Sequence, residues 1–418
     1  MHGQETASVT RDEALALDAA DPLARFHDAF ALPDGVIYLD GNSLGPPPRA
    51  VHDRLTEVSR RQWGEGLVRS WNTADWIGAP TRVGDKIAQR IGADPGEVTV
   101  ADSTTVNLFK LAAGACSLRP GRTTILSEAG NFPTDLYAVQ GLGALLEDRV
   151  RLKTVAPDEL LDAIDEDTAA VILTQVHYKT SRRWDLAAVT AAAHAKGALM
   201  LWDLCHSVGA IAVDLNGAQA DLAVGCSYKY LNGGPGAPAF LFVAKRHQGA
   251  IRSPLTGWMG HAEPFAFEDG YRACADIRGQ ITGTPPILGL AALEAGLDLQ
   301  LQAVPTLVEA KGLALAELFI AEAQARAADP SLVLTGPREA AARGLHVSFA
   351  HPQGYALVQA MMARGIIGDF RSPDIARFGF SPLFLSYAQV WDAAETLADV
   401  LATRAWDRPE FHQRAAVT

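Results

Sequence analysis

Short apolar runs alternate with helical and polar segments through the middle of the chain. Seven of these runs have the length and composition of β-strands: 98–101, 123–127, 149–154, 169–174, 198–203, 222–226 and 239–243. Helical patterns over 157–164 and 185–196 separate neighbouring runs. Such alternation predicts repeated βαβ units, and therefore an α/β fold with a mostly parallel sheet flanked by helices on both faces.

The N-terminal part of the chain has helical periodicity. Apolar spacing predicts a helix over 12–30, and a second helix is predicted over 48–61. Between them, 36–48 is expected to form a short strand and a tight loop, in which Asn42 and two glycines suit close approach to a ligand. The segment 63–76 is predicted to be a glycine-rich loop, whose three tryptophans either pack over a ligand or fill a domain junction.

The C-terminal part combines helices with a few strands. The chain is helical over about 286–321, and strand patterns at 332–334 and 346–349 then alternate with a helix near 355–364. This pattern predicts a smaller α+β domain. With 418 residues the chain is long enough for a large domain and a companion. We expect an N-terminal segment that packs with the small domain, a large domain and a small C-terminal domain, over 1–60, 61–290 and 291–418.

Composition excludes several classes of function. A net charge of −12 without a basic stripe gives no support for binding nucleic acid. The chain lacks a signal-peptide pattern and an apolar run of membrane-spanning length, so we expect no membrane association and a cytoplasmic location. The cysteines are scattered without CxxC spacing, which argues against a disulfide framework and against a zinc site, and we expect no metal: Cys116, Cys205, Cys226 and Cys274.

Lys229 is the first candidate for chemistry. It lies in 221–236, where an apolar run of strand character ends in a cluster of glycines and proline. Apolar surroundings disfavour an ammonium, lower the pKa of the amine and allow a Schiff base to form. A surface lysine that follows a strand is the alternative.

Asp203 favours a Schiff-base role for Lys229 over a surface lysine. It follows the apolar run 198–202, which is typical of a parallel strand buried on both faces, and ligands of such sheets collect at the carboxyl ends of the strands. A carboxylate one strand before a candidate Schiff-base lysine is what pyridoxal 5′-phosphate (PLP) requires, because it keeps the pyridine nitrogen protonated. His206 either flanks the ring and its phosphate or is an ordinary loop histidine.

Two further segments suit the ends of this cofactor. Thr104 and Thr105 fall in the first turn of a predicted helix, where free N–H groups, the helix dipole and hydroxyls favour a phosphate over simple capping. Phe132 follows the strand at 123–127 and can stack on a flat ring, with Asp135 free to bind a ring substituent. A proline turn with a helix cap is the alternative for that segment.

Together these motifs resemble the fold type I PLP enzymes, and within them the kynureninase family, over nearly the whole chain. The motifs that carry the resemblance are Tyr38-Leu-Asp-Gly-Asn-Ser-Leu-Gly45, Thr105-Val-Asn107, Asn131-Phe-Pro-Thr-Asp135, Asp203-Leu-Cys-His206, Ser227-Tyr-Lys-Tyr-Leu-Asn-Gly233, Gly257-Trp258 and Thr284-Pro-Pro286. Related desulfurases and class V aminotransferases usually have His where this chain has Tyr228, immediately before the lysine.

The resemblance implies a role for each matching residue. Lys229 would hold the cofactor and later move the substrate Cα proton, Asp203 would pair with the pyridinium nitrogen, and Phe132 would stack on the ring. Further cofactor contacts are implied for Thr104, Thr105, Asp135, Thr174, His206 and Tyr228. The positions of Trp258 and Thr284 are supplied by the neighbouring subunit in the family, which implies a homodimer with shared sites.

The substrate site is also implied by the resemblance. Arg377 matches the arginine that grips the substrate carboxylate, and its planar fork suits that task. Asn42 is a further candidate for binding the substrate, and Trp71 is expected to lie against its aromatic ring. Animal members have Asn at the position of Thr284 and a polar residue at that of Trp71, so this chain is expected to favour kynurenine over its 3-hydroxy form.

The implied reaction is hydrolysis of L-kynurenine to anthranilate and L-alanine, a step of tryptophan catabolism, with Tyr228 as a proton shuttle. Two alternatives keep the same motifs in whole or in part. Another fold type I PLP enzyme would differ only in the substrate pocket, and a desulfurase would need a mobile nucleophile, for which Cys274 is the best loop candidate. A non-catalytic binding protein would be expected to have lost Lys229 or Asp203, and both are present.

Overall fold

The computed structural model describes residues 8–327 and 329–415. A seven-stranded sheet forms the centre of the larger domain, with strand order β2-β8-β7-β6-β5-β3-β4. β8 is antiparallel to both of its neighbours, and the other paired strands are parallel. The predicted mostly parallel sheet is confirmed. Its strands are β2 (Val98–Val100), β3 (Thr124–Glu128), β4 (Arg151–Val155), β5 (Thr168–Thr174), β6 (Leu199–Asp203), β7 (Leu222–Gly225) and β8 (Phe240–Val243).

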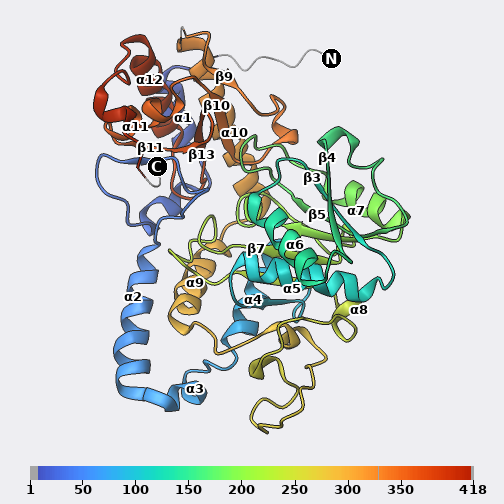
Figure 1. Ribbon diagram of the computed structural model, residues 1–418. Helices are drawn as coiled ribbons and strands as arrows, with labels where there is room; N and C mark the ends of the chain where they lie inside the picture. Colours follow the sequence, from blue (N-terminus) through green and yellow to red (C-terminus); the bar gives the residue numbers. More distant parts are fainter. Residues whose placement is uncertain (1–7, 328, 416–418) are drawn as a thin grey trace.

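Helices cover both faces of this sheet (Figure 1). Alternate residues of β5 separate the two layers: Val171 packs into one apolar cluster and Ile172 into the other, because successive side chains of a strand point to opposite faces. The cluster around Val171 includes α4 (Ala79–Ile91), α7 (Leu186–Ala195) and α9 (Ile287–Gln300). The cluster around Ile172 includes α5 (Thr104–Leu118) and α6 (Pro133–Leu145).

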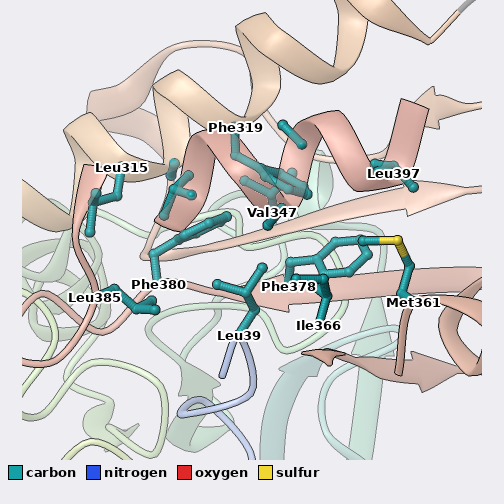
Figure 2. Packing of buried hydrophobic residues seen from close by; sticks show 14 of the residues in the cluster. Leu39, Leu315, Phe319, Val347, Met361, Ile366, Phe378, Phe380, Leu385 and Leu397 are labelled. Carbon is teal, nitrogen blue, oxygen red and sulfur yellow. The ribbon is translucent and has the colours of Figure 1, made fainter. Parts of the chain in front are cut away.

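A second core forms around a small antiparallel sheet near the C-terminus, with order β12-β13-β10-β9. Phe319, Phe378, Phe380 and Leu397 meet in this core (Figure 2). Its strands are β9 (Val333–Leu334), β10 (His346–Ala350), β12 (Asp369–Arg371) and β13 (Ile375–Gly379), and its helices are α10 (Pro305–Arg326), α11 (Gly354–Met362) and α12 (Tyr387–Ala402). This arrangement matches the predicted α+β part of the chain.

The N-terminal segment packs on the small core. α1 (Arg11–Ala19) contacts α12, and β1 (Ile37–Tyr38) pairs in parallel with β11 (Ile366–Ile367). Leu39 is fully buried in the same core. The N-terminal and C-terminal parts of the chain therefore form one packed unit, whereas unit boundaries at residues 60 and 290 stay a prediction.

Three predicted elements differ from the structure. The helix expected over 12–30 ends at Ala19, because Pro22 has no N–H and disfavours helical backbone in the residue before it; a short 3₁₀ helix, η1 (Ala24–Ala29), follows. The helix expected over 157–164 is only a 3₁₀ turn, η4 (Pro157–Glu159). Leu160 and Ile164 of this segment are buried, but Leu161 is 46% exposed, and the segment is too short to sustain a helix on its own.

The predicted loop over 63–76 is also wrong. α2 (Arg49–Glu57) continues as a π-helix, η2 (Val58–Gly66), and short helical turns reach α3 (Ser70–Thr73). Hydrogen bonds to Gln62 fasten the turn, from Ser70 Oγ to its carbonyl at 2.5 Å and from Trp76 Nε1 to its side chain at 2.8 Å. These tertiary contacts outweigh the loop composition. α2 packs beside α9, and the chain then continues to α3 at the lower left of the molecule (Figure 1).

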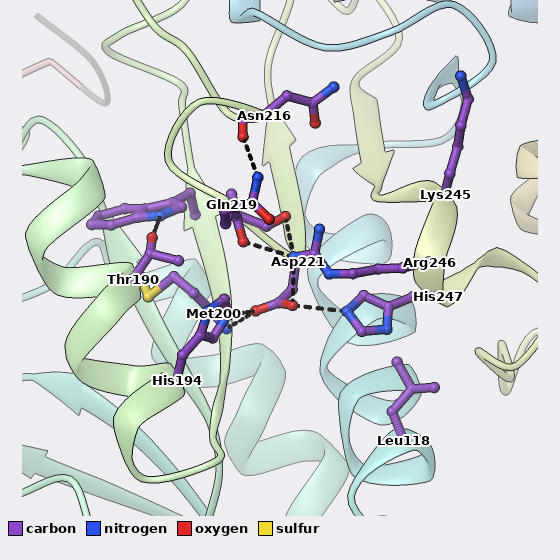
Figure 3. A network of polar contacts seen from close by, with 12 residues as sticks. Leu118, Thr190, His194, Met200, Asn216, Gln219, Asp221, Lys245, Arg246 and His247 are labelled. Carbon is purple, nitrogen blue, oxygen red and sulfur yellow. Dashed lines mark hydrogen bonds and ion pairs between the residues drawn. The ribbon is translucent and has the colours of Figure 1, made fainter.

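Asp221 lies immediately before β7, at the edge of the sheet opposite the carboxyl ends of the parallel strands, and anchors the start of that strand. The carboxylate is 2% exposed and accepts hydrogen bonds from the backbone N–H of Met200 at 2.8 Å and from His194 and His247, each at 2.7 Å. Arg246 completes the network (Figure 3). This network joins β6, β7, α7 and the segment after β8, so it stiffens the strands that carry the residues described next.

Among the residues that the structure describes, no helix is both long and apolar enough to cross a bilayer.

Candidate active site

The carboxyl ends of β5, β6 and β7 bring three predicted residues to one edge of the sheet. Thr174 and Asp203 end their strands as directly paired neighbours, and Lys229 follows β7 by four residues. A cavity of about 170 Å³ opens there. Its lining consists of Ser103, Thr104, Thr105, Phe132, Thr134, Thr174, Tyr178, Asp203, Cys205, His206, Tyr228 and Lys229.

The N-terminal loop holds the lysine loop in place. The N–H of Gly45 donates to the carbonyl of Tyr228 at 2.8 Å. A Cβ on Gly45 would lie 2.1 Å from the carbonyl oxygen of Lys229, so only glycine permits this approach. Asn232 closes the turn with a positive φ of 57°, and its side chain donates to the carbonyl of Pro46 at 3.0 Å. The backbone around Lys229 is therefore fixed from two sides.

The amine of Lys229 contacts His206. Nζ lies 3.0 Å from Nε2 of the histidine, which is 4% exposed. Burial, and then the charge of Lys229, lower the pKa of His206 well below its usual range. A neutral imidazole accepts a hydrogen bond from the lysine at neutral pH.

Two carboxyl groups lie buried behind the cavity. Asp203 accepts the N–H of Cys205 at 2.7 Å, and burial raises the pKa of its carboxyl. Asp135 accepts from Thr174 Oγ1 and from Asn131 Nδ2, each at 3.2 Å. Burial and the nearby charge of Asp203 raise the pKa of Asp135 well above its usual range. We conclude that Asp135 is protonated and that Asp203 bears the negative charge of the pair.

The start of α5 forms one end of the cavity. Ser103 caps the helix by accepting the N–H of Val106 at 3.4 Å, and Thr104 and Thr105 occupy its first turn. Thr105 Oγ1 lies 3.5 Å from Thr134 Oγ1. Free N–H groups and hydroxyls at the positive end of a helix dipole suit a phosphate.

Aromatic rings form a wall of the cavity. Phe132 precedes α6 and is 39% exposed, and its ring meets the edge of Tyr178 with centroids 5.1 Å apart. No sequence signal singled out Tyr178, which lies in an irregular loop after β5. Tyr228 lines the cavity beside the lysine, and burial raises the pKa of its phenol.

These residues fit PLP. Asp203 is a buried carboxylate, and the cation that acts on it, Lys229, is also the candidate for binding the cofactor aldehyde. The pyridinium of PLP would supply the positive partner that Asp203 needs once Lys229 holds the aldehyde. The α5 terminus lies in the same cavity, as a phosphate requires, and Phe132 offers an accessible ring face. Within the described chain, no group of three or more His, Cys, Asp or Glu side chains is arranged for a metal ion.

Arg377 and Asn42 lie next to this cavity without lining it. The guanidinium is 1% exposed, and its Nε donates to Asp369 at 2.8 Å, its Nη2 to Ser43 at 2.8 Å and its Nη1 to the carbonyl of Tyr178 at 2.7 Å. Asn42 is fully buried, and its amide oxygen, once turned toward the guanidinium, accepts from Nη2 and Nε at 3.2 and 3.1 Å. Arg377 thus already has a carboxylate partner in the chain.

Asp369 and Ser43 were missed by the sequence reasoning. Asp369 pairs directly with Arg377 across two antiparallel strands, β12 and β13. A prediction of that hairpin would have placed the two side chains together, but both strands are short and only the arginine carried a family signal. Ser43 follows Asn42 in the tight loop predicted over 36–48, so the argument that singled out Asn42 could also have identified Ser43.

Three predicted residues lie outside the cavity of their own chain. Trp71 is on α3, where its ring contacts the edge of Trp76 at 5.6 Å. Trp258 opens η5 (Trp258–Gly260) and packs against Phe265 at 5.6 Å. Thr284 is exposed just before α9. The single chain does not bring these three together with Lys229.

Comparison with known proteins agrees with this fold and this cavity. A family model described as the kynureninase C-terminal domain matches residues 308–397. The kynureninase of Burkholderia pseudomallei (strain 1106a) is 51% identical over 414 residues, which cover 98% of this chain and 100% of that protein. The kynureninase of Pseudomonas fluorescens is 48% identical over the same shares.

Solved structures with the same fold are more distant in sequence. An apo cysteine desulfurase from Thermococcus onnurineus NA1 has a TM-score of 0.76 at 17% identity, covering 95% of this chain and 100% of that one. A mutant of C-DES with glycine covalently linked to its PLP cofactor has a TM-score of 0.75 at 18% identity, covering 88% and 97%.

The parallel sheet and the lysine–aspartate pair at its carboxyl edge define a PLP-dependent enzyme of fold type I, as the sequence predicts. Within that class, identity near one half over almost the whole length decides the family. The chain belongs to the kynureninase family.

Proposed function

We propose that this enzyme hydrolyses L-kynurenine to anthranilate and L-alanine, at the cavity around Lys229. The observation that carries the proposal is the lysine and Asp203 on adjacent strand ends, in a chain about half identical to kynureninases over its whole length. The distant desulfurase neighbours support the fold alone.

The residues that would hold PLP surround the cavity. Lys229 would bind its aldehyde, Asp203 its pyridinium nitrogen, and the first turn of α5 its phosphate, with Phe132 against the ring. Further contacts are assigned to Asp135, Thr174, His206 and Tyr228. When bound, PLP supplies an electron sink that stabilises negative charge at the substrate Cα.

Two side chains would move protons. Lys229 would take the proton from the substrate Cα, because its amine would lie beside the reacting carbon. Tyr228 keeps its proton at neutral pH, since burial raises the pKa of the phenol. It therefore serves as a donor when the Cβ–Cγ bond of the hydrated side-chain carbonyl breaks.

The substrate carboxylate would bind beside Arg377. Its Nη1 is hydrogen-bonded to a carbonyl, and Asp369 occupies the Nε and Nη2 edge. Asn42 provides an amide at the same guanidinium. The substrate carboxylate therefore competes with, or adds to, the ion pair between Arg377 and Asp369. This arrangement favours ligands that also gain contacts through an aromatic ring.

A homodimer would complete the site. Trp71, Trp258 and Thr284 do not line the cavity of their own chain, so each serves a site only in an assembly of chains. Trp258, Phe265 and Phe267 form an exposed aromatic cluster, and solvent-facing aromatic clusters of this kind are typical of interfaces. We propose that Trp258 and Thr284 reach the cavity of a second copy.

A desulfurase is disfavoured by the cysteines. Cys205 lines the cavity, but a hydrogen bond with Cys226 and burial raise the pKa of its thiol well above its usual range. Cys274, the predicted loop candidate, does not line the cavity, and its thiol contacts Asp276 at 3.3 Å. Neither is a ready nucleophile.

The test is direct. The purified enzyme, supplied with PLP, is incubated with L-kynurenine while anthranilate fluorescence is recorded, and L-cysteine is assayed in parallel for released sulfide. Anthranilate without sulfide supports the proposal. Sulfide release without anthranilate would replace it with desulfuration.

A further inference from the structure

His346 opens β10 at the boundary between the two domains. Its neighbour Leu345 packs in the core of the large domain, whereas Val347 packs in the core of the small one. The ring is 1% exposed, and neither nitrogen has a hydrogen-bond partner among the described residues. Buried polar groups without partners are costly and uncommon, so this ring needs an explanation.

The ring faces the histidine that contacts Lys229. The centroids of His346 and His206 are 5.3 Å apart, with their planes tilted by 56°. His206 presents Nε2 to the lysine at 3.0 Å, while its Nδ1 is buried without a described partner. At this spacing one buried water can bridge a nitrogen of His346 and Nδ1 of His206.

We propose that His346 is a positioning residue that holds His206 in the tautomer with its proton on Nδ1. That proton is donated toward His346, and the lone pair of Nε2 then points at Lys229. In the other tautomer an N–H of His206 would face the lysine ammonium and repel it. His346 therefore acts on the lysine through a second ring and across the domain boundary.

The consequence for chemistry concerns cofactor capture. A lysine attacks an aldehyde only after its ammonium has lost a proton, and the Nε2 lone pair of His206, 3.0 Å away, is placed to take that proton. This inference rests on the proposed function, because it takes Lys229 as the residue that binds PLP. It adds a residue of the small domain to the control of that step.

Burial and the surrounding cations keep the imidazole rings of His206 and His346 neutral. Burial and cations lower the pKa of His206 and of His346 well below the usual range, and Asp369 opposes this effect at His346. A neutral imidazole has one donor and one acceptor nitrogen, which is what a chain of two rings needs. The charged and titratable groups that face the pair are Lys229, His177, Asp369, Arg371 and Arg377.

The first measurement is the rate at which the apoenzyme captures PLP, followed by visible absorbance from pH 6 to about pH 9, across the usual range of histidine titration. In His346→Leu, capture should slow about tenfold, because His206 loses the acceptor that holds its proton on Nδ1 and then presents an N–H, not a lone pair, to Lys229 in part of the molecules. In His346→Gln the amide oxygen accepts the same hydrogen bond, so the rate should stay within about twofold. His351→Gln, another buried histidine just after β10, is the matched control and should not change the rate.

The second measurement reads the tautomer itself. In apoenzyme with ¹⁵N-labelled histidines, the spectrum should show His206 protonated on Nδ1, and His346→Leu should give a mixture of tautomers. A wild-type spectrum with the proton on Nε2, or unchanged capture in His346→Leu, would overturn the inference. If the leucine variant does not fold, the wild-type spectrum and His346→Gln decide the question.

Reduction of the captured cofactor and peptide mapping separate this inference from the proposed site. An adduct on Lys229 together with unchanged capture in His346→Leu would refute only the role of His346. An adduct on another lysine would refute the site itself. An adduct on Lys229 with slowed capture supports both.

Discussion

Burial decides the protonation of individual residues at this site. Asp203 and Asp135 are nearly inaccessible and share a single negative charge, whereas His206 is held neutral beside Lys229. A buried charge without a partner is expensive, so each of these groups depends strongly on its neighbours. Single substitutions here are therefore informative.

Replacing Lys229 by alanine should abolish turnover and leave the fold intact, because both the covalent hold on PLP and the Cα proton transfer need its amine. Anthranilate fluorescence gives the activity, and circular dichroism the fold. Lys196→Ala, an exposed lysine on the opposite side of the sheet, is the control and should retain full activity. Turnover by Lys229→Ala without added amine would contradict the assignment.

Replacing Tyr228 by phenylalanine should lower kcat by roughly 10²- to 10⁴-fold, the usual contribution of a positioned proton donor. KM should change little, since the ring remains. Tyr137→Phe, an exposed tyrosine on α6, provides the comparison. A variant whose kcat/KM falls only because KM rises, with kcat unchanged, would indicate that the phenol binds substrate and does not donate a proton.

The residues that the sequence identified share a local signal. Lys229, Asp203 and Thr104 each follow an apolar strand, and the carboxyl ends of parallel strands meet at one edge. Asp369 and His346 carried no such signal, because their positions depend on pairing between distant strands. Burial of Arg377 against Asp369 follows from that pairing and was not predictable from the arginine alone.

At the scale of elements, the segment 63–76 shows how tertiary hydrogen bonds can override a prediction made from composition. Apolar runs located β5 and β6 because both strands are buried on both faces. The segment 63–76 has a loop composition, yet contacts with Gln62 support helical turns. Local propensity is a weak prior when tertiary contacts of this kind are available.

Asp221 provides a test at this scale. Asp221→Asn should destabilise the fold by about 3–5 kcal/mol at neutral pH, because an amide cannot accept all of the hydrogen bonds that the buried carboxylate accepts and Arg246 loses its ionic partner. Urea unfolding, followed by fluorescence, measures the change. Asp298→Asn removes an exposed ion pair with Lys86 and should shift stability by no more than about 1 kcal/mol.

The same variant has a predicted pH dependence. Burial alone would raise the pKa of Asp221, but hydrogen bonds from His194, His247 and Met200 outweigh it and lower the pKa far below the usual range. A depressed carboxylate pKa stabilises the fold above the unfolded value of about 3.9, and this stabilisation is lost as the pH falls further. The stability gap between wild type and Asp221→Asn should therefore be constant above about pH 5 and shrink below about pH 4. A gap that widens in acid would contradict this sign.

At the scale of the whole molecule, the proposed dimer makes a prediction about mixtures. Lys229→Ala chains and Trp258→Ala chains, each inactive or weak alone, should regain activity when subunits exchange, because some mixed dimers contain one site free of both changes. The expected recovery is at most about one quarter of wild-type activity if exchange is random and sites act independently. Mixing Lys229→Ala with Asp203→Ala is the control and should give none, since both residues belong to one chain's cavity.

We also propose that residues outside the single-chain cavity influence the choice of substrate. Without a partner for the ring hydroxyl, binding of 3-hydroxykynurenine loses about 1–3 kcal/mol, so kcat/KM should favour L-kynurenine by roughly tenfold to a hundredfold. Thr284→Asn combined with Trp71→His should narrow that ratio by restoring polar partners. Measuring both substrates with both enzymes tests this, and a wild type that prefers the hydroxylated form would refute it.

The pairing of β1 with β11 also constrains how the enzyme is made. Ser43, just after β1, donates to Asp369, a residue 326 positions later. Closing so large a loop costs entropy that only completed contacts repay. On the ribosome, the N-terminal strand and Leu39 must therefore wait, unpaired and exposed, until almost the entire chain has been synthesised. Termination of synthesis before β11 would omit Asp369 and Arg377 and leave β1 unpaired, with an apolar edge open to aggregation.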